Sequence, residues 1–330
     1  MTNLVLIITY KCNCSCIMCT IHLKNETIEM SIPDIVSILS NKEFSKIEEV
    51  NITGGEPTLH SEFENLLINI SKVLPALKKI IINTNGIDYI RIDSCALNLQ
   101  KKISSNIFVV WAVSVDGINK KTNIRGITNS CLLQQKTVKT LKNSLKPYKN
   151  SQVVVSFTIT SKNYNNIDDI YNFVASNRIL LELIIATVNT VYINSQPLQN
   201  YFTLKHSETN KLLNNIKKIS NKPYIADNYR YLDMVDKKLQ GHKYIHPCIF
   251  REKQGLLVEP NFDSYLCGMA KESFIGNLMS DEFFCNFFNY DSKKIEPICE
   301  CCMSNNFSFT NDLQHKKVTL LNYIRRKRIE

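Results

Sequence analysis

Six apolar runs separated by helix-like segments constrain the fold of this chain more than any other feature. The runs at 78–86 and 108–117 are apolar almost throughout, as is typical of strands buried on both faces of a parallel sheet. Strands that alternate with helices form βαβ units. The sequence therefore predicts an α/β fold with a partial (β/α)6 barrel of the TIM type, two units short of a closed eight-stranded barrel. Strands are expected at 4–10, 48–54, 78–86, 108–117, 152–160 and 179–188, and helices after Ser31 and at 62–73, 132–145 and 167–176.

The strand–helix alternation stops after the sixth strand, so the barrel core is assigned to 1–190. An Asn- and Lys-rich linker over 191–243 contains one expected helix, at 207–220. A cysteine-bearing region over 244–304 is expected to form a small second domain. The last segment, 305–330, is strongly basic and is expected to be a solvated helix or tail, because cations are favourable near a helix C-terminus.

Composition narrows the environment and the partners of the chain. Its 330 residues include 12 cysteines and carry a net charge of +10. No apolar run reaches the ~18 residues that a membrane-spanning helix needs, and no signal peptide is recognisable. A cytoplasmic protein without membrane contact is therefore expected, with reduced thiols that serve metal binding or redox chemistry. Nucleic acid is not the expected partner, because aromatic residues are sparse in the basic tail.

Four cysteines crowd the stretch KCNCSCIMC directly after the first strand. Cys12, Cys16 and Cys19 have the spacing C-x3-C-x2-C. A zinc site would need four ligands, so that Cys14 would have to join, whereas thiolates are the standard ligands of iron–sulfur clusters. Three thiolates on a four-iron cluster leave one iron open to a small chelating molecule. The loop also follows a barrel strand, at the end where such folds place their chemistry.

Further motifs close the following strands. They are GGEP at 54–57, NTNG at 83–86 and SVDG at 114–117, followed by IRG and VSFTIT. Two glycines let the backbone approach a ligand closely, and the carboxylate of Glu56 is suited to accept hydrogen bonds from an ammonium group. Together with the cysteine triplet, these motifs resemble those of the radical S-adenosylmethionine (SAM) superfamily.

This resemblance implies that Cys12, Cys16 and Cys19 bind a [4Fe–4S] cluster and that SAM chelates its open iron. Cys14 is then surplus and is expected to pack or hydrogen-bond within the loop. Met18 stands where the family usually has an aromatic residue against the adenine, and its thioether is also able to pack on a ring. The other expected SAM-binding residues are Gly54, Gly55, Glu56, Pro57, Asn85, Ser114, Asp116, Arg125, which is placed to meet a carboxylate, and Ser156, which is placed to face ribose hydroxyls.

A second cysteine set lies around the hairpin-like stretch LLVEPNFDSYLCG and the following FIGNL. It resembles the twitch domain, the short form of the SPASM extension of radical SAM enzymes. The resemblance implies one auxiliary [4Fe–4S] cluster closed by four protein ligands, and a structural zinc ribbon on the same thiols is the alternative. The expected ligands are Cys248, Cys267, Cys299 and Cys302.

Cys285 is a candidate for a different role. A free thiol near the substrate is able to return a hydrogen atom to a carbon radical, as in radical SAM epimerases. The alternative is a buried thiol between Phe284 and Phe287. Cys95 and Cys131 are expected to be small core residues.

The resemblance further implies an enzyme that reductively cleaves SAM to a 5′-deoxyadenosyl radical, which abstracts hydrogen from an unactivated carbon. Oxidation, epimerisation and cross-linking are all compatible outcomes. The expected substrate is a peptide or a small metabolite, since peptides are common substrates of enzymes with this extension but no peptide-recognition domain precedes the first strand. A flavodoxin or ferredoxin is the expected electron donor, and the basic surface suits such acidic partners.

Two other classes are weaker interpretations. A non-catalytic iron–sulfur or zinc regulator that binds nucleic acid would need no chelating pocket, so the GGEP motif and the six strand–helix units argue against it. An activase that makes a glycyl radical on a partner would carry ferredoxin-like cysteine insertions within the barrel, and none are evident in this sequence.

Overall fold

The computed structural model describes residues 1–24, 28–119, 124–186, 206–220, 222–226, 229–243, 245 and 247–302. Its strands are β1 (Asn3–Ile7), β2 (Glu49–Thr53), β3 (Lys79–Thr84), β4 (Phe108–Ser114), β5 (Ser151–Ile159), β6 (Leu180–Ile185), β7 (Gly255–Val258), β8 (Asp263–Tyr265) and β9 (Phe274–Asn277). Its helices are α1 (Ile32–Leu39), α2 (Phe63–Val73), α3 (Tyr89–Lys102), α4 (Ser130–Ser144), α5 (Ile167–Asn177), α7 (His206–Ser220), α8 (Tyr229–Leu239), α9 (Phe283–Asn289) and α10 (Glu296–Cys301).

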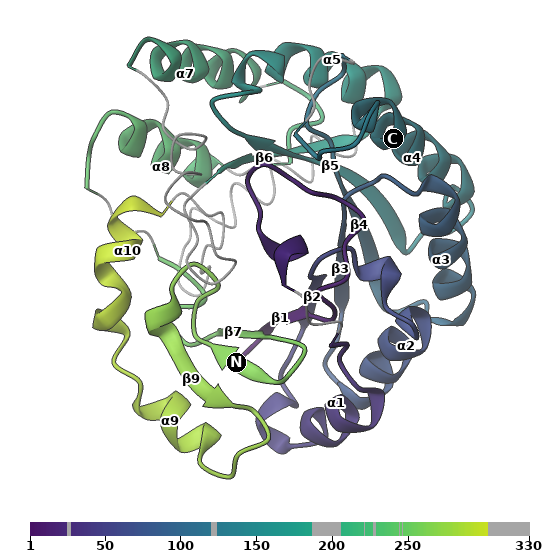
Figure 1. The fold of residues 1–330 in the computed structure, drawn as a ribbon, viewed down its shortest axis with the longest axis vertical. Helices are drawn as coiled ribbons and strands as arrows, with labels where there is room; N and C mark the ends of the chain where they lie inside the picture. Colours follow the sequence, from purple (N-terminus) through teal and green to yellow (C-terminus); the bar gives the residue numbers. More distant parts are fainter. Residues whose placement is uncertain are drawn as a thin grey trace.

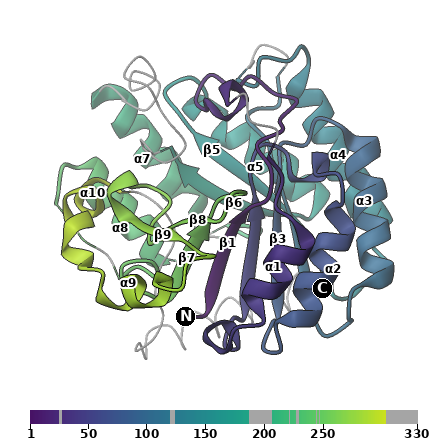
Figure 2. The same cartoon turned by 60° about the horizontal axis from the view of Figure 1, so that its bottom comes forward.

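Strands β1 to β6 form the parallel sheet that the sequence predicts. The sheet curves into a partial barrel, and helices α1 to α5 cover its outer face (Figures 1 and 2). Because these strands run parallel, their carboxyl ends meet at one rim. The loops that carry the cysteine triplet and the glycine motif therefore converge there.

The alternation of side chains along β1 separates two apolar regions. Leu4 and Leu6 belong to the large core between the sheet and the helices. Val5 and Ile7 belong to a smaller cluster that also contains Leu257. This smaller cluster lies on the concave face, where it supports the loop that follows β1.

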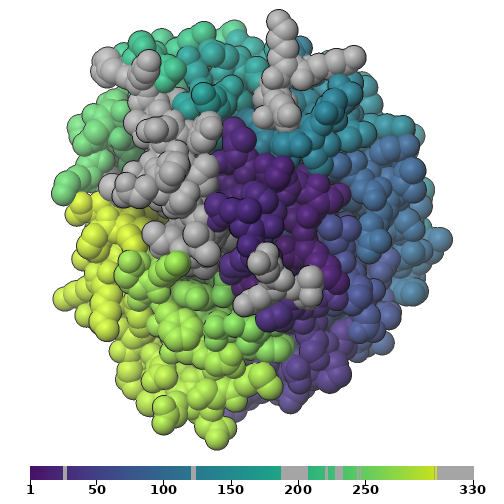
Figure 3. Space-filling view, viewed as in Figure 1, coloured from purple at the N-terminus to yellow at the C-terminus, as the bar shows by residue number. Residues whose placement is uncertain are grey.

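The C-terminal cysteine region continues the barrel sheet, although the sequence predicts a small second domain there. The predicted hairpin is present as β7 and β8, but β7 also pairs in parallel with β1. The resulting nine-stranded order is β6-β5-β4-β3-β2-β1-β7-β8-β9. On the face shown in Figure 3, residues of the N-terminal loop (purple) and of the C-terminal region (green) lie side by side. The two cysteine sets are thus carried by one continuous sheet.

Several helices match the prediction, and others are not predicted. α1 begins after Ser31 with Pro33 in its first turn, and α2, α4, α5 and α7 agree with the expected ranges to within a few residues. α3, and α8 in the linker, are not predicted. Parts of the linker and the whole basic tail at 305–330 lie outside the described residues. Among the helices that the structure describes, none is both long and apolar enough to cross a membrane.

Candidate active site

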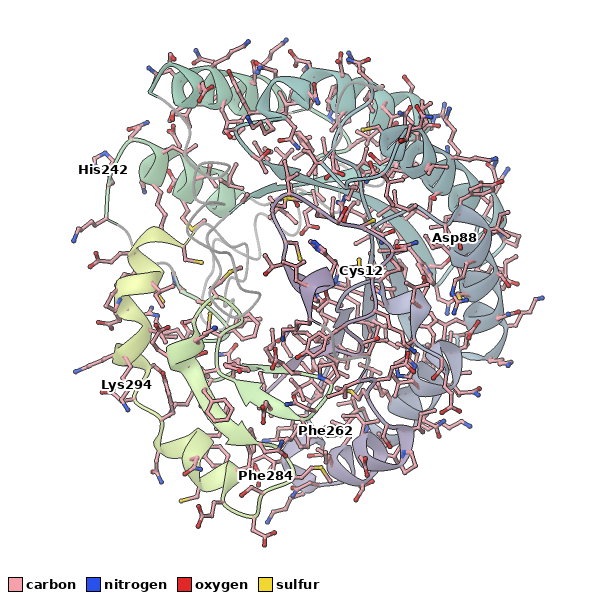
Figure 4. The ribbon with its side chains drawn as sticks, in the orientation of Figure 1. Cys12, Asp88, His242, Phe262, Phe284 and Lys294 are labelled. Atoms are coloured by element: carbon pink, nitrogen blue, oxygen red, sulfur yellow. The ribbon has the colours of Figure 1, made fainter. Side chains whose placement is uncertain are left out.

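A cavity of about 160 Å³ opens at the rim where the loop after β1 meets the ends of β2, β3 and β4. In Figure 4, Cys12 lies near the middle of the ring formed by the sheet and helices. The structure thus brings most of the predicted residues to one place. The cavity is lined by Cys12, Cys14, Cys16, Met18, Cys19, Ile21, His22, Thr53, Gly54, Gly55, Asn83, Thr84, Asn85, Ser114 and Arg125.

The cysteine loop is anchored by the IRG motif. Ser15 N–H donates to the carbonyl of Arg125 at 3.0 Å, and Ile17 N–H donates to the carbonyl of Ile124 at 2.9 Å. Gly126 has a φ of 70°, and a Cβ there would overlap the hydroxyl of Ser15. The motif therefore needs a glycine because the cysteine loop passes directly over it.

The two glycines of the GGEP motif let the end of β2 touch the start of the cysteine loop. Gly55 N–H donates to the carbonyl of Thr9 at 2.9 Å, and Glu56 N–H donates to that of Lys11 at 2.8 Å. A Cβ at Gly55 would overlap the carbonyl oxygen of Lys11 and lie 2.7 Å from its carbonyl carbon. Since backbone atoms yield little, this approach excludes a side chain.

Replacing Gly55 with alanine is expected to lower SAM-dependent formation of 5′-deoxyadenosine at least about tenfold, equivalent to ~1.4 kcal/mol. The added methyl group would push the loop that starts at Lys11 away from the glycine motif. Gly241→Ala is the control, because a Cβ at Gly241 would have no atom within 4 Å. Equal activities of the two variants would contradict this role of Gly55.

The carboxylate of Glu56 is held by hydrogen bonds from within the protein. One carboxylate oxygen accepts hydrogen bonds from Thr58 N–H at 3.3 Å, Thr58 Oγ1 at 2.7 Å and Thr84 Oγ1 at 2.9 Å. The other oxygen accepts a hydrogen bond from Asn85 N–H at 2.7 Å. The side chain is buried; burial raises the pKa of Glu56, and the donors oppose that shift. Glu56 thus ties the end of β2 to the end of β3, and its contact with the ammonium group of SAM stays a prediction.

Asp116 and Arg125 form a buried pair beside the loop. Arg125 Nε and Nη2 donate to the two carboxylate oxygens of Asp116 at 2.6 and 3.0 Å, and Gln134 Nε2 donates to the same carboxylate at 2.8 Å. The remaining Arg125 nitrogen, Nη1, lies 3.7 Å from Cys16 Sγ. Two nitrogens of Arg125 are thus bound to Asp116 and the third faces a thiol of the triplet, so a contact of Arg125 with a SAM carboxylate stays a prediction.

The four thiols of the loop differ in acidity. Side-chain hydrogen bonds with Cys14 lower the pKa of Cys16 to about 7, and the charge of Arg125 acts in the same direction against burial. Hydrogen bonding with Cys14 also lowers the pKa of Cys12. The same bonds raise the pKa of Cys14, whereas burial raises the pKa of Cys19 to about 11. Cys14 is thus the buried, protonated member that hydrogen-bonds within the loop.

In protein prepared without iron, alkylation of Cys16 is expected to rise through pH about 7, and that of Cys19 only near pH about 11. The sign follows because a lowered pKa populates the reactive thiolate at lower pH. Mass spectrometry of iodoacetamide-labelled peptides over a pH series measures both midpoints. A common midpoint for the two cysteines would show that Arg125 and Cys14 do not distinguish them.

The remaining predicted residues divide into two groups. Asn85 Nδ2 donates to Asn13 Oδ1 at 2.7 Å, which ties the end of β3 to the loop, and Ser114 and Met18 line the cavity. Ser156 instead donates to Glu182 at 2.9 Å, and Pro57 is buried at the start of a short 3₁₀ helix. Neither Ser156 nor Pro57 is among the cavity-lining residues.

The second cysteine set also converges. Cys248, Cys267, Cys299 and Cys302 all line one small, mostly apolar cavity. Within the ranges that the structure describes, no three His, Cys, Asp or Glu side chains converge closely enough for a single metal ion. The four thiols therefore share one cavity, and whether they bind an iron–sulfur cluster or zinc stays a prediction.

Cys285 does not lie where a hydrogen donor would be useful. It is exposed on α9, and Asn289 Nδ2 lies 3.4 Å from its Sγ. The neighbouring Phe284 packs against Phe44 beside α1, at the outer rim of the molecule and far from Cys12 in Figure 4. The expectation of a hydrogen-donating Cys285 is therefore corrected, as is the alternative of a buried thiol.

Two residues near the cavity escape sequence reasoning. His22 lines the cavity, and in the described part of the chain its buried Nδ1 has no hydrogen-bond partner. Tyr265, on β8, packs in the cluster that contains Cys12 and Cys19, and burial raises its pKa to about 12. The position of His22 three residues after the triplet is a local signal, whereas that of Tyr265 depends on the pairing of β7 with β1.

The residues present fit an anionic cluster with a bound chelating molecule. Four thiols and two closely approaching glycines line the cavity, Arg125 faces one thiol, and the orphaned His22 nitrogen offers a polar contact. The fold and this site together define a partial α/β barrel whose rim gathers the cysteines of the C-x3-C-x2-C motif and the glycine pair.

Comparison with known proteins gives the same class. The "Radical SAM superfamily" profile matches residues 6–176, more than half of the 330-residue chain. The chain therefore belongs to the radical SAM superfamily. It is a radical SAM enzyme with SAM and a [4Fe–4S] cluster as cofactors.

Sequence relatives match less than half of the chain. A GTP 3′,8-cyclase of Clostridium acetobutylicum is 31% identical over 158 residues, which cover 45% of this chain and 46% of the cyclase. The mycofactocin maturase MftC of Mycolicibacterium smegmatis is 30% identical over 122 residues, which cover 36% of this chain and 29% of the maturase. The chain thus matches half or less of the length of these relatives.

Solved structures match both halves of the chain in fold. An anSMEcpe structure with bound AdoMet and Cp18Cys peptide has a TM-score of 0.63 at 17% identity and covers 99% of this chain and 98% of that chain. Streptococcus suis SuiB bound to the precursor peptide SuiA has a TM-score of 0.63 at 15% identity and covers 89% and 66%. At these identities the likeness concerns the fold alone.

Proposed function

We propose that this enzyme cleaves SAM at a cluster held by Cys12, Cys16 and Cys19 and oxidises a carbon of a peptide substrate. The observation that carries this assignment is the convergence of the three thiols and the Gly54–Gly55 backbone on one cavity. When bound, the first cluster with SAM supplies a hydrogen-abstracting 5′-deoxyadenosyl radical, and the auxiliary cluster supplies a one-electron acceptor.

The residues of the chain orient and neutralise these groups. Arg125 places positive charge beside Cys16, and the glycine pair leaves room for the amino acid part of SAM against the backbone. Met18 offers an apolar surface to the adenine, and Asn85 and Ser114 offer polar contacts from the ends of β3 and β4. In the C-terminal region, Cys248, Cys267, Cys299 and Cys302 hold the auxiliary cluster.

The structural neighbours support a peptide substrate, whereas the sequence relatives support a small metabolite. The structural neighbours that match both halves of the chain include two bound to peptides. The second candidate is a small molecule such as a nucleotide, because a GTP 3′,8-cyclase shares 31% identity with this chain over 158 residues. The assignment to peptides rests on the C-terminal cysteine region, which the structural matches cover and which shares the barrel sheet.

An acidic flavodoxin or ferredoxin is the proposed electron donor. The chain carries 40 Lys and Arg residues against 30 Asp and Glu residues, a net charge of +10. Complementary charge accelerates encounter between such partners, and the effect weakens with salt. The rate of cluster reduction by flavodoxin is therefore expected to fall as ionic strength rises.

The test is mass spectrometry of anaerobic reactions that contain dithionite, SAM and either a peptide fraction or GTP. Stimulated 5′-deoxyadenosine together with a peptide lighter by two hydrogens is the expected result. A gain of one deuterium in heavy water would instead indicate epimerisation, and stimulation by GTP alone would favour the small-metabolite candidate. Absence of 5′-deoxyadenosine under every condition would contradict the function itself.

A further inference from the structure

Arg251 lies at the second cysteine cavity, and among the residues that the structure describes its buried Nε–H has no acceptor. It follows Cys248 by three residues and lines the cavity with the four thiols. In the described part of the chain its buried Nε has no hydrogen-bond partner, while Nη1 is 3.9 Å from Glu296. A buried donor without an acceptor is costly. The cavity is therefore the place where an acceptor for Nε–H is needed.

Lys238 extends from α8 to the backbone that carries the last two thiols. Its Nζ donates to the carbonyl of Cys299 at 2.7 Å and to that of Cys302 at 2.6 Å. These carbonyls close α10, where a cation is favourable. Figure 1 shows α8 beside α10, so a linker helix carries a positive charge to the C-x2-C segment.

Both cations lie next to this cysteine set, Arg251 in the lining of the cavity and Lys238 at the backbone of Cys299 and Cys302. The lining is otherwise apolar, with Phe250, Ile295 and Ile298. In such surroundings a nearby charge is screened much less than in water.

We propose that Arg251 and Lys238 form a cationic clamp that raises the reduction potential of the auxiliary cluster. Arg251 donates its Nε–H to a cluster sulfur, and Lys238 places its charge behind the last two ligands. Reduction adds one negative charge to a cluster, so adjacent cations and hydrogen bonds to sulfur stabilise the reduced form. The clamp, which rests on the auxiliary site of the proposed function, suits a cluster that accepts an electron from the substrate.

The experiment is a redox titration of the anaerobically reconstituted full chain followed by electron paramagnetic resonance. The auxiliary cluster is recognised as the component whose spectrum does not change when SAM is added. At the wild-type midpoint, Arg251→Leu is expected to lower the ratio of reduced to oxidised auxiliary cluster at least tenfold, a shift of about 59 mV for one electron. Lys238→Met is expected to shift it in the same direction. Lys237→Met is the control, because Lys237 pairs with Asp233 on the exposed face of the same helix.

The outcomes separate the clamp from the auxiliary site itself. An unchanged midpoint in Arg251→Leu and Lys238→Met, with full iron content, would overturn the clamp. If Arg251→Leu loses the auxiliary iron, Arg251→Lys is measured instead, because lysine keeps the charge but lacks Nε–H. A midpoint potential between those of the wild type and Lys238→Met then supports the clamp. A wild-type midpoint potential in Arg251→Lys overturns the role of Nε–H. Absence of a SAM-insensitive component from the wild-type protein would instead contradict the proposed auxiliary site.

Discussion

Replacement of Cys12, Cys16 and Cys19 together by alanine is expected to reduce 5′-deoxyadenosine formation to the level of an enzyme-free control. The three thiols line one cavity with the glycine pair, and no other thiol there is free to replace them, because Cys14 hydrogen-bonds within the loop. The same variant is expected to keep the iron of the auxiliary site, since the second cysteine set lines a separate cavity. Iron and sulfide analysis with liquid chromatography of the nucleoside products measures both effects.

Two single variants serve as controls for the triple replacement. Cys131→Ala removes a buried thiol of α4 outside the cavity and is expected to retain SAM cleavage. Cys14→Ala removes the thiol that lowers the pKa of Cys12 and Cys16 and is expected to retain the cluster with reduced activity. Retention of full activity by the triple variant would contradict the assignment of these cysteines as ligands.

Replacement of Asp116 by asparagine is expected to lower the free energy of unfolding by about 3–5 kcal/mol. The change removes the carboxylate that Arg125 grips with two hydrogen bonds and leaves a guanidinium only 7% exposed without its counter-charge. Since Arg125 also carries the carbonyl that anchors Ser15, the cysteine loop should loosen as well. Urea unfolding of the iron-free protein measures the stability.

A double-mutant comparison separates charge from packing. Asp116→Asn combined with Arg125→Met removes both charges and is expected to be less destabilised than Asp116→Asn alone. The exposed pair Lys78–Glu48 provides a surface reference, where Glu48→Gln is expected to cost no more than about 1 kcal/mol. If Asp116→Asn were as mild as Glu48→Gln, the buried pair would not be the support of the loop described above.

The barrel and the cysteine positions follow from the sequence because their signals are local. The apolar runs and the C-x3-C-x2-C spacing lie within short stretches, and the structure places the triplet and both motif glycines in one cavity. The hydrogen bonds by which Glu56 joins β2 to β3 could not be predicted from a local pattern. Its partners Thr84 and Asn85 come from the end of another strand, so its orientation depends on the register of β2 and β3.

Other differences between the sequence-based expectations and the structure arise from contacts and positions that the local sequence does not reveal. β7 pairs with β1 across about three quarters of the chain, and that pairing brings Tyr265 to the cluster against which Cys12 also packs. Asp116 and Arg125, in contrast, both lie between β4 and α4, and residue type alone did not distinguish an Asp116 partner of Arg125 from a ligand carboxylate. Cys285 was a candidate on residue type alone, and nothing in its sequence surroundings indicates that α9 lies at the outer rim.

The central claim is that one iron of the N-terminal cluster is left open for SAM. Mössbauer spectroscopy of protein reconstituted with iron-57, recorded before and after addition of SAM, tests it most directly. The account predicts two four-iron clusters, of which one changes at a single iron site when SAM binds and the other does not change. Two clusters that both remain unaltered by saturating SAM, or only one cluster whose four irons all have protein ligands, would contradict it.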